Sequence, residues 1–164
     1  MDIKSVKNIR KKSFSKIFNK DLKLNELLNN NDNRFKHLRN PVFQNIYQYL
    51  INYLLNISNE WFNNKNFTIL DWGCGYGYVS YLLKNLNQNV LSCDIATYYN
   101  PIIESANINV TELKHEYKLP YNDCEFDVFL SFGVLEHTKN NLLSLYEINR
   151  VLKPNGLFFC FFLP

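Results

Sequence analysis

Metal-binding and disulfide patterns are missing from this chain of 164 residues. Its four cysteines are widely scattered without a CxxC pair, and its three histidines, His37, His115 and His137, lie on different segments. A zinc site or a disulfide framework requires closely spaced or paired ligands, so neither is expected. We therefore interpret the cysteines as reduced thiols of an intracellular protein.

Long apolar runs are also missing. No stretch of the sequence approaches the roughly 20 apolar residues of a membrane-spanning helix, and the N-terminus lacks the uninterrupted apolar core of a signal peptide. A cytoplasmic location is therefore the expectation. Hydrophobic residues make up 46% of the chain and aromatic residues 16%, which argues against disorder and for a domain with a core.

Positive charge is concentrated at one end. Residues 1–23 hold eight Lys or Arg against two Asp, a balance of +6, whereas the remainder holds ten basic and thirteen acidic residues, a balance of −3. This asymmetry predicts a basic helical N-terminal arm or cap over residues 1–40 and a folded domain over residues 41–164. No aromatic and basic platform accompanies the lysines, so nucleic acid is not the expected partner.

Residues 41–164 alternate between helical and extended patterns. After a helix over 41–61, strands are expected over 67–71, 90–93, 108–113, 126–132 and 157–163, with helices over 78–85, 101–106 and 141–152 and a turn over 154–156. This order predicts an α/β fold, a doubly wound and mainly parallel sheet. The last helix is expected to bury Leu142, Leu145, Ile148 and Leu152, and Arg150 and Lys153 to neutralise its C-terminal end.

One segment carries most of the functional information. The first strand runs into Asp71, then into a turn with glycine at every second position, then into a helix; the second strand ends in Asp94. Strand, glycine turn, helix, strand and acid form the layout of a mononucleotide-binding half. The spacing is not that of a dinucleotide site, because position 78 is Tyr. A carboxylate at Asp71 repels a pyrophosphate and attracts an ammonium group, which disfavours a nicotinamide oxidoreductase and favours S-adenosylmethionine.

Three stretches in order strengthen this interpretation: 69–77, with the sequence Ile-Leu-Asp-Trp-Gly-Cys-Gly-Tyr-Gly; 119–121, Leu-Pro-Tyr, followed by Phe-Asp-Val at 126–128; and Val-Leu-Glu-His at 134–137, leading to 149–156. Residues 68–163 thereby resemble the class I S-adenosylmethionine-dependent methyltransferases of the type 11 subgroup. The resemblance implies a Rossmann-like sheet of strand order 3-2-1-4-5, with the family's strands 6 and 7 missing. The apolar fifth strand would then be an exposed edge, through which homo- or hetero-oligomers are expected.

The resemblance also implies a cofactor site. Asp71 would hold the ammonium end, Asp94 would accept hydrogen bonds from the ribose hydroxyls, and His115 and Glu116 replace the family's Asp-Ala near the adenine. Main-chain and small residues would line the rest of the pocket, namely Gly73, Cys74, Gly75, Gly77, Ser131, Phe132 and Gly133. Simpler alternatives stay open: Asp94 as a helix cap, Cys74 as a filler, and Trp72, Tyr76 and Tyr78 as core rather than as a wall for the sulfonium.

The expected function is methyl transfer to an oxygen or nitrogen of a small molecule, such as a sugar or an aromatic metabolite. Residues 131–134 lack the Asn/Asp-Pro-Pro-aromatic motif of family members that methylate adenine or glutamine amide nitrogen. His137, after the fourth strand, is the candidate general base, and its alternative role is to order the loop. A non-catalytic methyltransferase-like subunit, or a truncated inactive protein, is the second hypothesis.

Overall fold

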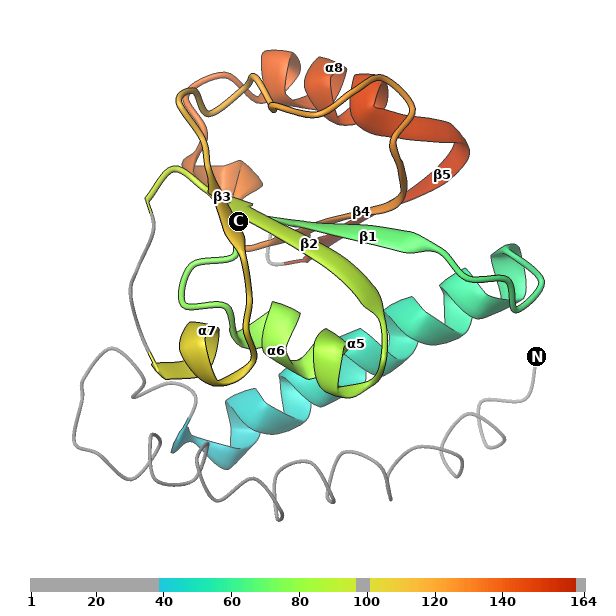
Figure 1. Ribbon diagram of the computed structural model, residues 1–164, viewed down its shortest axis with the longest axis vertical. Coiled ribbons are helices and arrows are strands. Elements are labelled where there is room, and N and C mark those ends of the chain that lie inside the picture. Colours follow the sequence, from blue (N-terminus) through green and yellow to red (C-terminus); the bar gives the residue numbers. More distant parts are fainter. Residues whose placement is uncertain (1–38, 97–100, 162–164) are drawn as a thin grey trace. The chain divides into compact units, whose positions relative to one another are not determined.

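A computed structural model describes residues 39–96 and 101–161 (Figure 1). Most of the predicted basic arm lies outside these residues. The chain divides into two compact units after Asn56, and the predicted boundary between residues 40 and 41 stays a prediction. Helix α5, Pro41–Trp61, confirms the first expected helix. Its start follows from Pro41, which is preorganised for a first helical turn, and from Asn40, whose Oδ1 accepts a hydrogen bond of 2.9 Å from the amide of Val42.

Five parallel strands form one sheet in the order β3-β2-β1-β4-β5, which confirms the predicted order. The strands are β1 Thr68–Trp72, β2 Asn89–Asp94, β3 Val110–Glu112, β4 Phe126–Phe132 and β5 Leu152–Phe161. Helices α6, Tyr78–Asn85, and α7, Pro101–Ser105, lie on one face, and α8, Asn141–Val151, lies on the other (Figure 1). The sheet is therefore doubly wound, and the carboxyl ends of its strands share one edge.

One hydrophobic core cluster lies between the sheet and α8, and the buried side chains of α6 lie on the other face of the sheet. Phe126 and Phe129 of β4 are fully buried, and the ring of Phe129 packs 5.7 Å from that of Trp72 in β1. Ile148 and Val151 of α8 complete the cluster on the side that faces away from α6. Each such side chain contributes about 2 kcal/mol through burial, so this layer fixes the strands whose ends carry the site. Among the described helices, none is long and apolar enough to cross a membrane.

The expected turn at residues 154–156 is wrong. Strand β5 begins earlier, because Leu152 pairs with Phe126 while Leu157 pairs with Val128, so the ladder continues on both sides of an irregularity. Asn155 takes a φ of +64° inside it, and its carbonyl accepts a 2.9 Å hydrogen bond from the indole of Trp61. The turn-forming residues therefore make a bulge in the strand and do not end it.

The expected buried stripe of α8 is only partly correct. Ile148 is buried, but Leu142 is 62% exposed and Leu145 42% exposed. The face that meets the core is instead Ser144, Ile148 and Val151. Asn140 caps the helix, because its side chain accepts a 3.1 Å hydrogen bond from the amide of Leu143, and the Ser144 hydroxyl donates to the Asn140 carbonyl.

Candidate functional site

The glycine turn between β1 and α6 lies at the carboxyl edge of the sheet. Its three glycines all take left-handed backbone angles, with φ of +68° at Gly73, +53° at Gly75 and +75° at Gly77. Residues with a Cβ adopt such angles only at a cost. The amides of Gly73 and Cys74 both donate to the carbonyl of Cys93, at 2.8 and 3.1 Å. The turn is thereby held against the end of β2.

The three glycines have different reasons to lack a side chain. A Cβ on Gly73 would lie 2.4 Å from Val134 Cγ2, and one on Gly77 would lie 2.8 Å from Ile103 Cγ1. At both positions the protein's own side chains already fill the space that a Cβ would take, and the contact of these glycines with a cofactor stays a prediction. A Cβ on Gly75 would meet nothing within 4 Å. Gly75 is therefore the glycine that faces open space.

Asp94 closes the second side of this space. Its Oδ2 accepts a 2.7 Å hydrogen bond from the amide of Gly75, and its Oδ1 accepts a longer one, 3.3 Å, from the amide of Ala96. Each carboxylate oxygen has a second lone pair, so both oxygens retain capacity for a further donor. Gly75 and Asp94, predicted to share a site, are brought into direct contact. Among the described residues, the carboxylate accepts from the turn and from the amide two positions further along the chain.

Asp71 lies beneath the turn and is 1% exposed. Its carboxylate accepts a 2.5 Å hydrogen bond from the hydroxyl of Ser80 in α6, and Ser80 in turn lies 2.7 Å from the hydroxyl of Ser92. Burial raises the pKa of Asp71 to about 6, although the hydrogen bonds from Ser80 oppose the shift. Sequence reasoning found Asp71 but missed Ser80, because a serine three residues into a helix carries no distinctive signal.

Cys74 in the turn and Trp72 at the end of β1 are the two neighbouring residues for which the sequence left a simpler, structural role open. Burial raises the pKa of the Cys74 thiol far above its ordinary value, and the nearby Asp71 and Asp94 raise it further. Cys74 is thus a neutral thiol at physiological pH, and its place in the pocket lining stays a prediction. Trp72 is 3% exposed and belongs to the core cluster, so its ring is not a wall for a cation.

The end of β4 contributes the third side of the site. Ser131 is fully buried beside Cys160, its neighbour in β5, and the ring of Phe132 packs 4.9 Å from that of Phe161. Gly133 has a φ of +69° and donates its amide to the carbonyl of Phe161 at 3.0 Å. Next to it lies Glu136, whose Oε2 is buried and makes no hydrogen bond within the described residues. A buried carboxylate oxygen without a donor is unusual, and sequence reasoning had not selected it.

His137 ends a short 3-10 helix, η2, Leu135–His137. Its amide donates to the carbonyl of Val134 at 2.8 Å, and its side chain is exposed. Within the described residues, no side-chain hydrogen bond orients the ring. The position at the carboxyl edge agrees with the prediction, whereas the role of general base stays a prediction.

His115 and Glu116 lie after β3, the next strand beyond β2. The amide of Leu113 donates a 2.7 Å hydrogen bond to the carbonyl of Asp94, so this segment starts beside the predicted ribose-binding acid. The exposed ring of His115 stacks on Tyr117 at 6.4 Å. The carboxylate of Glu116 accepts a 3.1 Å hydrogen bond from the amide of Lys139 and lies 3.4 Å from its Nζ. Glu116 therefore ties this loop to the loop after η2.

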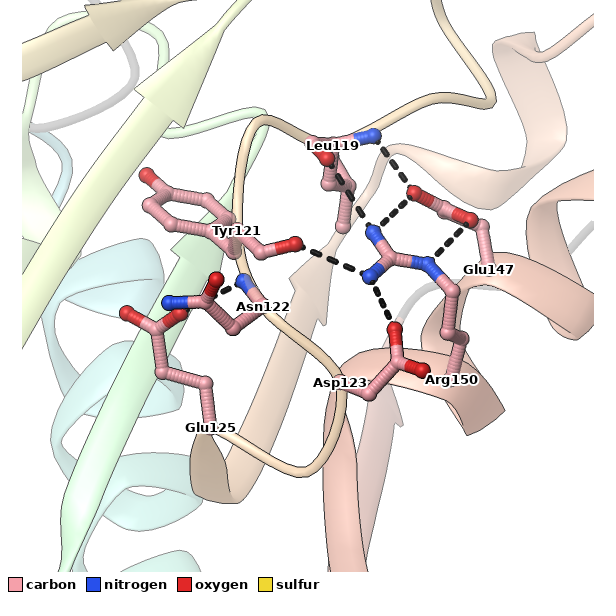
Figure 2. Close-up of polar contacts among 7 residues, drawn as sticks. All are labelled: Leu119, Tyr121, Asn122, Asp123, Glu125, Glu147 and Arg150. Atoms are coloured by element: carbon pink, nitrogen blue, oxygen red, sulfur yellow. Dashed lines mark hydrogen bonds and ion pairs between the residues drawn. The ribbon is translucent and has the colours of Figure 1, made fainter.

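Arg150 binds the same loop from α8 (Figure 2). The guanidinium forms a bidentate ion pair with Glu147, at 2.9 and 2.6 Å. It also donates to the carbonyls of Leu119 and Tyr121, at 3.1 and 2.9 Å, and to Asp123 at 2.7 Å. Arg150 lies in the last turn of α8, as the expected neutralisation of the helix end requires, and its donors are in addition directed at the loop. Lys153 lies in β5 and pairs with Asp127 at 2.9 Å.

Comparison with known proteins supports the family and the fold. Residues 70–160 match the family model described as methyltransferase domain. A tRNA U34 carboxymethyltransferase of Nautilia profundicola is 31% identical over 108 residues, covering 62% of this chain and 36% of the relative. A ubiquinone biosynthesis O-methyltransferase of Pelagibacter ubique is 30% identical over 100 residues, covering 58% of this chain and 41% of the relative.

A solved structure from Galdieria sulphuraria superposes with a TM-score of 0.60 at 23% identity, covering 71% of this chain and 46% of that one. This likeness shows the shared fold. The chain spans about two fifths of the length of the curated relatives, 36% and 41% of the two above. Since the family model matches more than half of the chain, the chain belongs to the S-adenosylmethionine-dependent methyltransferases.

Proposed function

We propose that this domain transfers a methyl group from S-adenosylmethionine to an oxygen or nitrogen of a small-molecule acceptor. The observation that carries the proposal is the contact between Gly75 and Asp94 at the carboxyl edge of the sheet. A glycine facing open space allows the backbone to approach a ligand, and an adjacent carboxylate can accept hydrogen bonds from two hydroxyls. When bound, S-adenosylmethionine supplies a methyl group on a sulfonium, already activated for displacement.

The residues of the chain then act by binding and orientation. Asp94 holds the ribose hydroxyls with the lone pairs that Gly75 and Ala96 leave available. Asp71, buried under the turn and fixed by Ser80, supplies a negative charge that favours the ammonium group of the cofactor. The main chain of Gly73 and Gly75 covers the amino-acid part, and the end of β4 around Phe132 and Gly133 excludes water near the reacting centre.

The acceptor side of the site favours a hydrogen-bond donor. The buried Oε2 of Glu136 has no hydrogen-bond partner among residues 39–96 and 101–161, and a hydroxyl or amine of an acceptor would provide one. His137, one residue further and exposed to solvent, would take up the proton that such a nucleophile releases. If His137→Ala leaves kcat unchanged on an identified acceptor, then the role of general base is wrong and the histidine only orders its loop.

The charge of residues 24–164 supports a small molecule over a nucleic acid, although several relatives are named for tRNA. Residues 24–164 carry thirteen acidic and ten basic residues, a balance of −3 that disfavours phosphates at this part of the chain, whereas residues 1–23 add +6 and bring the whole chain to +3. We expect turnover with small hydroxyl or amine acceptors, such as catechols, and none with bulk tRNA, when transfer is followed with labelled S-adenosylmethionine. Transfer to tRNA alone would overturn the assignment of the acceptor.

Cofactor binding is the first test. Titration calorimetry is expected to show S-adenosylhomocysteine binding with a micromolar Kd and no binding of NAD. Binding of NAD with no response to S-adenosylhomocysteine would overturn the proposal. Binding without turnover across the acceptor panel would favour the second candidate, a non-catalytic methyltransferase-like subunit.

The second candidate has one structural observation in its favour. β5 is the last strand of the sheet order, and its residues Leu157–Phe161 are all partly exposed and apolar. An edge of this kind favours pairing with another chain. We expect self-association or co-purification with a partner protein, and light scattering that shows a monomer at high concentration would contradict this.

A further inference from the structure

We propose that Arg150 and Glu147 are positioning residues for the base of the cofactor, acting through the loop at residues 113–125. This loop follows β3 and returns to β4 without a helix or strand of its own apart from one isolated bridge. Connections of this length are uncommon in compact domains and are usually functional. The inference rests on the proposed function and adds the element that sets its specificity for the nucleoside.

The first step concerns where the base would lie. The glycine turn belongs to β1, and the acid predicted to hold the ribose, Asp94, ends β2. A nucleoside laid along the strand ends in this order continues toward β3, the neighbour of β2 on its other side. The chain leaving β3 is tied to the same place, because Leu113 donates its amide to the carbonyl of Asp94 at 2.7 Å. The loop is therefore the wall that a base would meet.

The second step concerns what holds this wall. Glu147 Oε1 accepts a 2.7 Å hydrogen bond from the amide of Leu119, and Arg150 donates to two loop carbonyls and to Asp123 (Figure 2). The hydrogen bond from Arg150 is the main cause of a lowered pKa of Glu147, so the pair is charged over the physiological range. One planar guanidinium thus fixes several points of the loop at once, which a lysine could not do.

The third step connects the held segment to the site. Tyr121, whose carbonyl Arg150 binds, packs its ring edge-on against Phe126 at 5.0 Å. Leu119 is buried in the same core cluster as Cys93 at the end of β2. The contacts of Arg150 and Glu147 with the loop, which we call the clamp, therefore fix the position of the loop relative to the sheet. They also fix the groups at His115 and Glu116 that would face the base. Removal of the clamp contacts should reduce the preference for one base over another while leaving Asp94 and the glycine turn in place.

The test compares two ligands that differ only in the base. S-adenosylhomocysteine has an amino group at position six of the purine, and S-inosylhomocysteine has a carbonyl there. We expect wild-type protein to bind the adenosine compound at least about tenfold more tightly, a difference of one or two hydrogen bonds. Arg150→Lys is expected to reduce this preference to less than about threefold, mainly by weakening the adenosine compound. Glu147→Gln, which keeps the side-chain shape, is expected to give an intermediate preference.

A matched control separates positioning from stability. Lys153→Gln removes another partly exposed ion pair, with Asp127, at the junction of β4 and β5. It is expected to lower Tm while leaving the preference between the two ligands unchanged. The proposal is overturned if the clamp variants lose both ligands in parallel, if the preference is unchanged, or if wild-type protein binds both ligands equally. Should Arg150→Lys fail to fold, Glu147→Gln decides. Failure of wild-type protein to bind either ligand would sink the proposed function itself.

Discussion

The amide of Gly75 donates a 2.7 Å hydrogen bond to Oδ2 of Asp94, across the carboxyl ends of β1 and β2. This contact joins the two elements that sequence reasoning had assigned to one ligand. It also orients the carboxylate before a ligand arrives, which reduces the ordering cost of binding. The residues of the site are therefore preorganised by their own main chain.

Replacement of Asp94 by asparagine tests this arrangement. The amide oxygen can still accept from Gly75, so the fold should be retained, but the charged acceptor for the ribose is lost. Hydrogen bonds to charged groups contribute about 1.5–3 kcal/mol, so affinity for S-adenosylhomocysteine should fall about 10- to 100-fold by calorimetry. Asp127→Asn, at the opposite end of the sheet, is the control and should leave the affinity unchanged.

The pH dependence of stability should reveal the buried carboxylate of Asp71. Its pKa is raised from 3.8 to about 6 in the folded protein, so the folded state binds the proton more tightly than the unfolded state. Its contribution is most favourable below pH 4, and the free energy of unfolding should fall as pH rises from 4 to about 6, by about 3 kcal/mol. Urea unfolding of Asp71→Asn should show a flatter profile and greater stability at pH 8. An unchanged slope would refute the assignment.

The same ionisation should control the cofactor. Because a charged Asp71 favours the ammonium group, affinity for S-adenosylhomocysteine should increase between pH 5 and 7 with a midpoint near the raised pKa, about 6. Asp71→Asn should bind more weakly at pH 7 and lose this midpoint. The variant would thus be more stable at pH 8 and bind the cofactor more weakly at pH 7. Calorimetry across the pH range measures the change in affinity.

Two alanine substitutions in the glycine turn should differ in their effects on stability and on cofactor affinity. Gly73→Ala places a Cβ 2.4 Å from Val134 Cγ2, and we expect about 2–4 kcal/mol of destabilisation from the clash and the positive φ. Gly75→Ala meets no atom within 4 Å, so only the backbone cost of about 1 kcal/mol remains. Thermal unfolding should therefore separate them. Gly75→Ala should nevertheless lose cofactor affinity, and retention of full affinity would show that the open space is not the binding site.

The elements of the fold that local chemistry decides were predictable. Helix α6 and strand β4 have the predicted bounds, Tyr78–Asn85 and Phe126–Phe132, because one follows a glycine turn and the other is apolar throughout. Strand β5 was missed in its first half, since Pro154, Asn155 and Gly156 favour a turn in isolation. Pairing with β4 on both sides keeps this segment in the sheet, and such long-range pairing has no local signal.

The candidate site likewise contains residues that local sequence signals predicted and residues that only long-range contacts define. Gly75 and Asp94 were predictable because their spacing along the chain reflects the strand ends that bring them together. The role of Arg150 was not, because its loop partners lie 27 to 31 residues earlier and only the fold places them under the guanidinium. Leu142 and Leu145 show the converse: their helical spacing suggests a core face, yet the face that α8 buries is that of Ser144, Ile148 and Val151.

The unequal thiols provide an experimental handle. Burial raises the pKa of Cys93 to about 12 and, with neighbouring carboxylates, that of Cys74 higher still, and it also raises the pKa of Cys160. Cys124 is exposed, and it lies in the loop that Arg150 clamps. A maleimide fluorophore added briefly at neutral pH should therefore attach selectively to Cys124. The sequence thus already carries a labelling position whose fluorescence would report conformational changes of that loop.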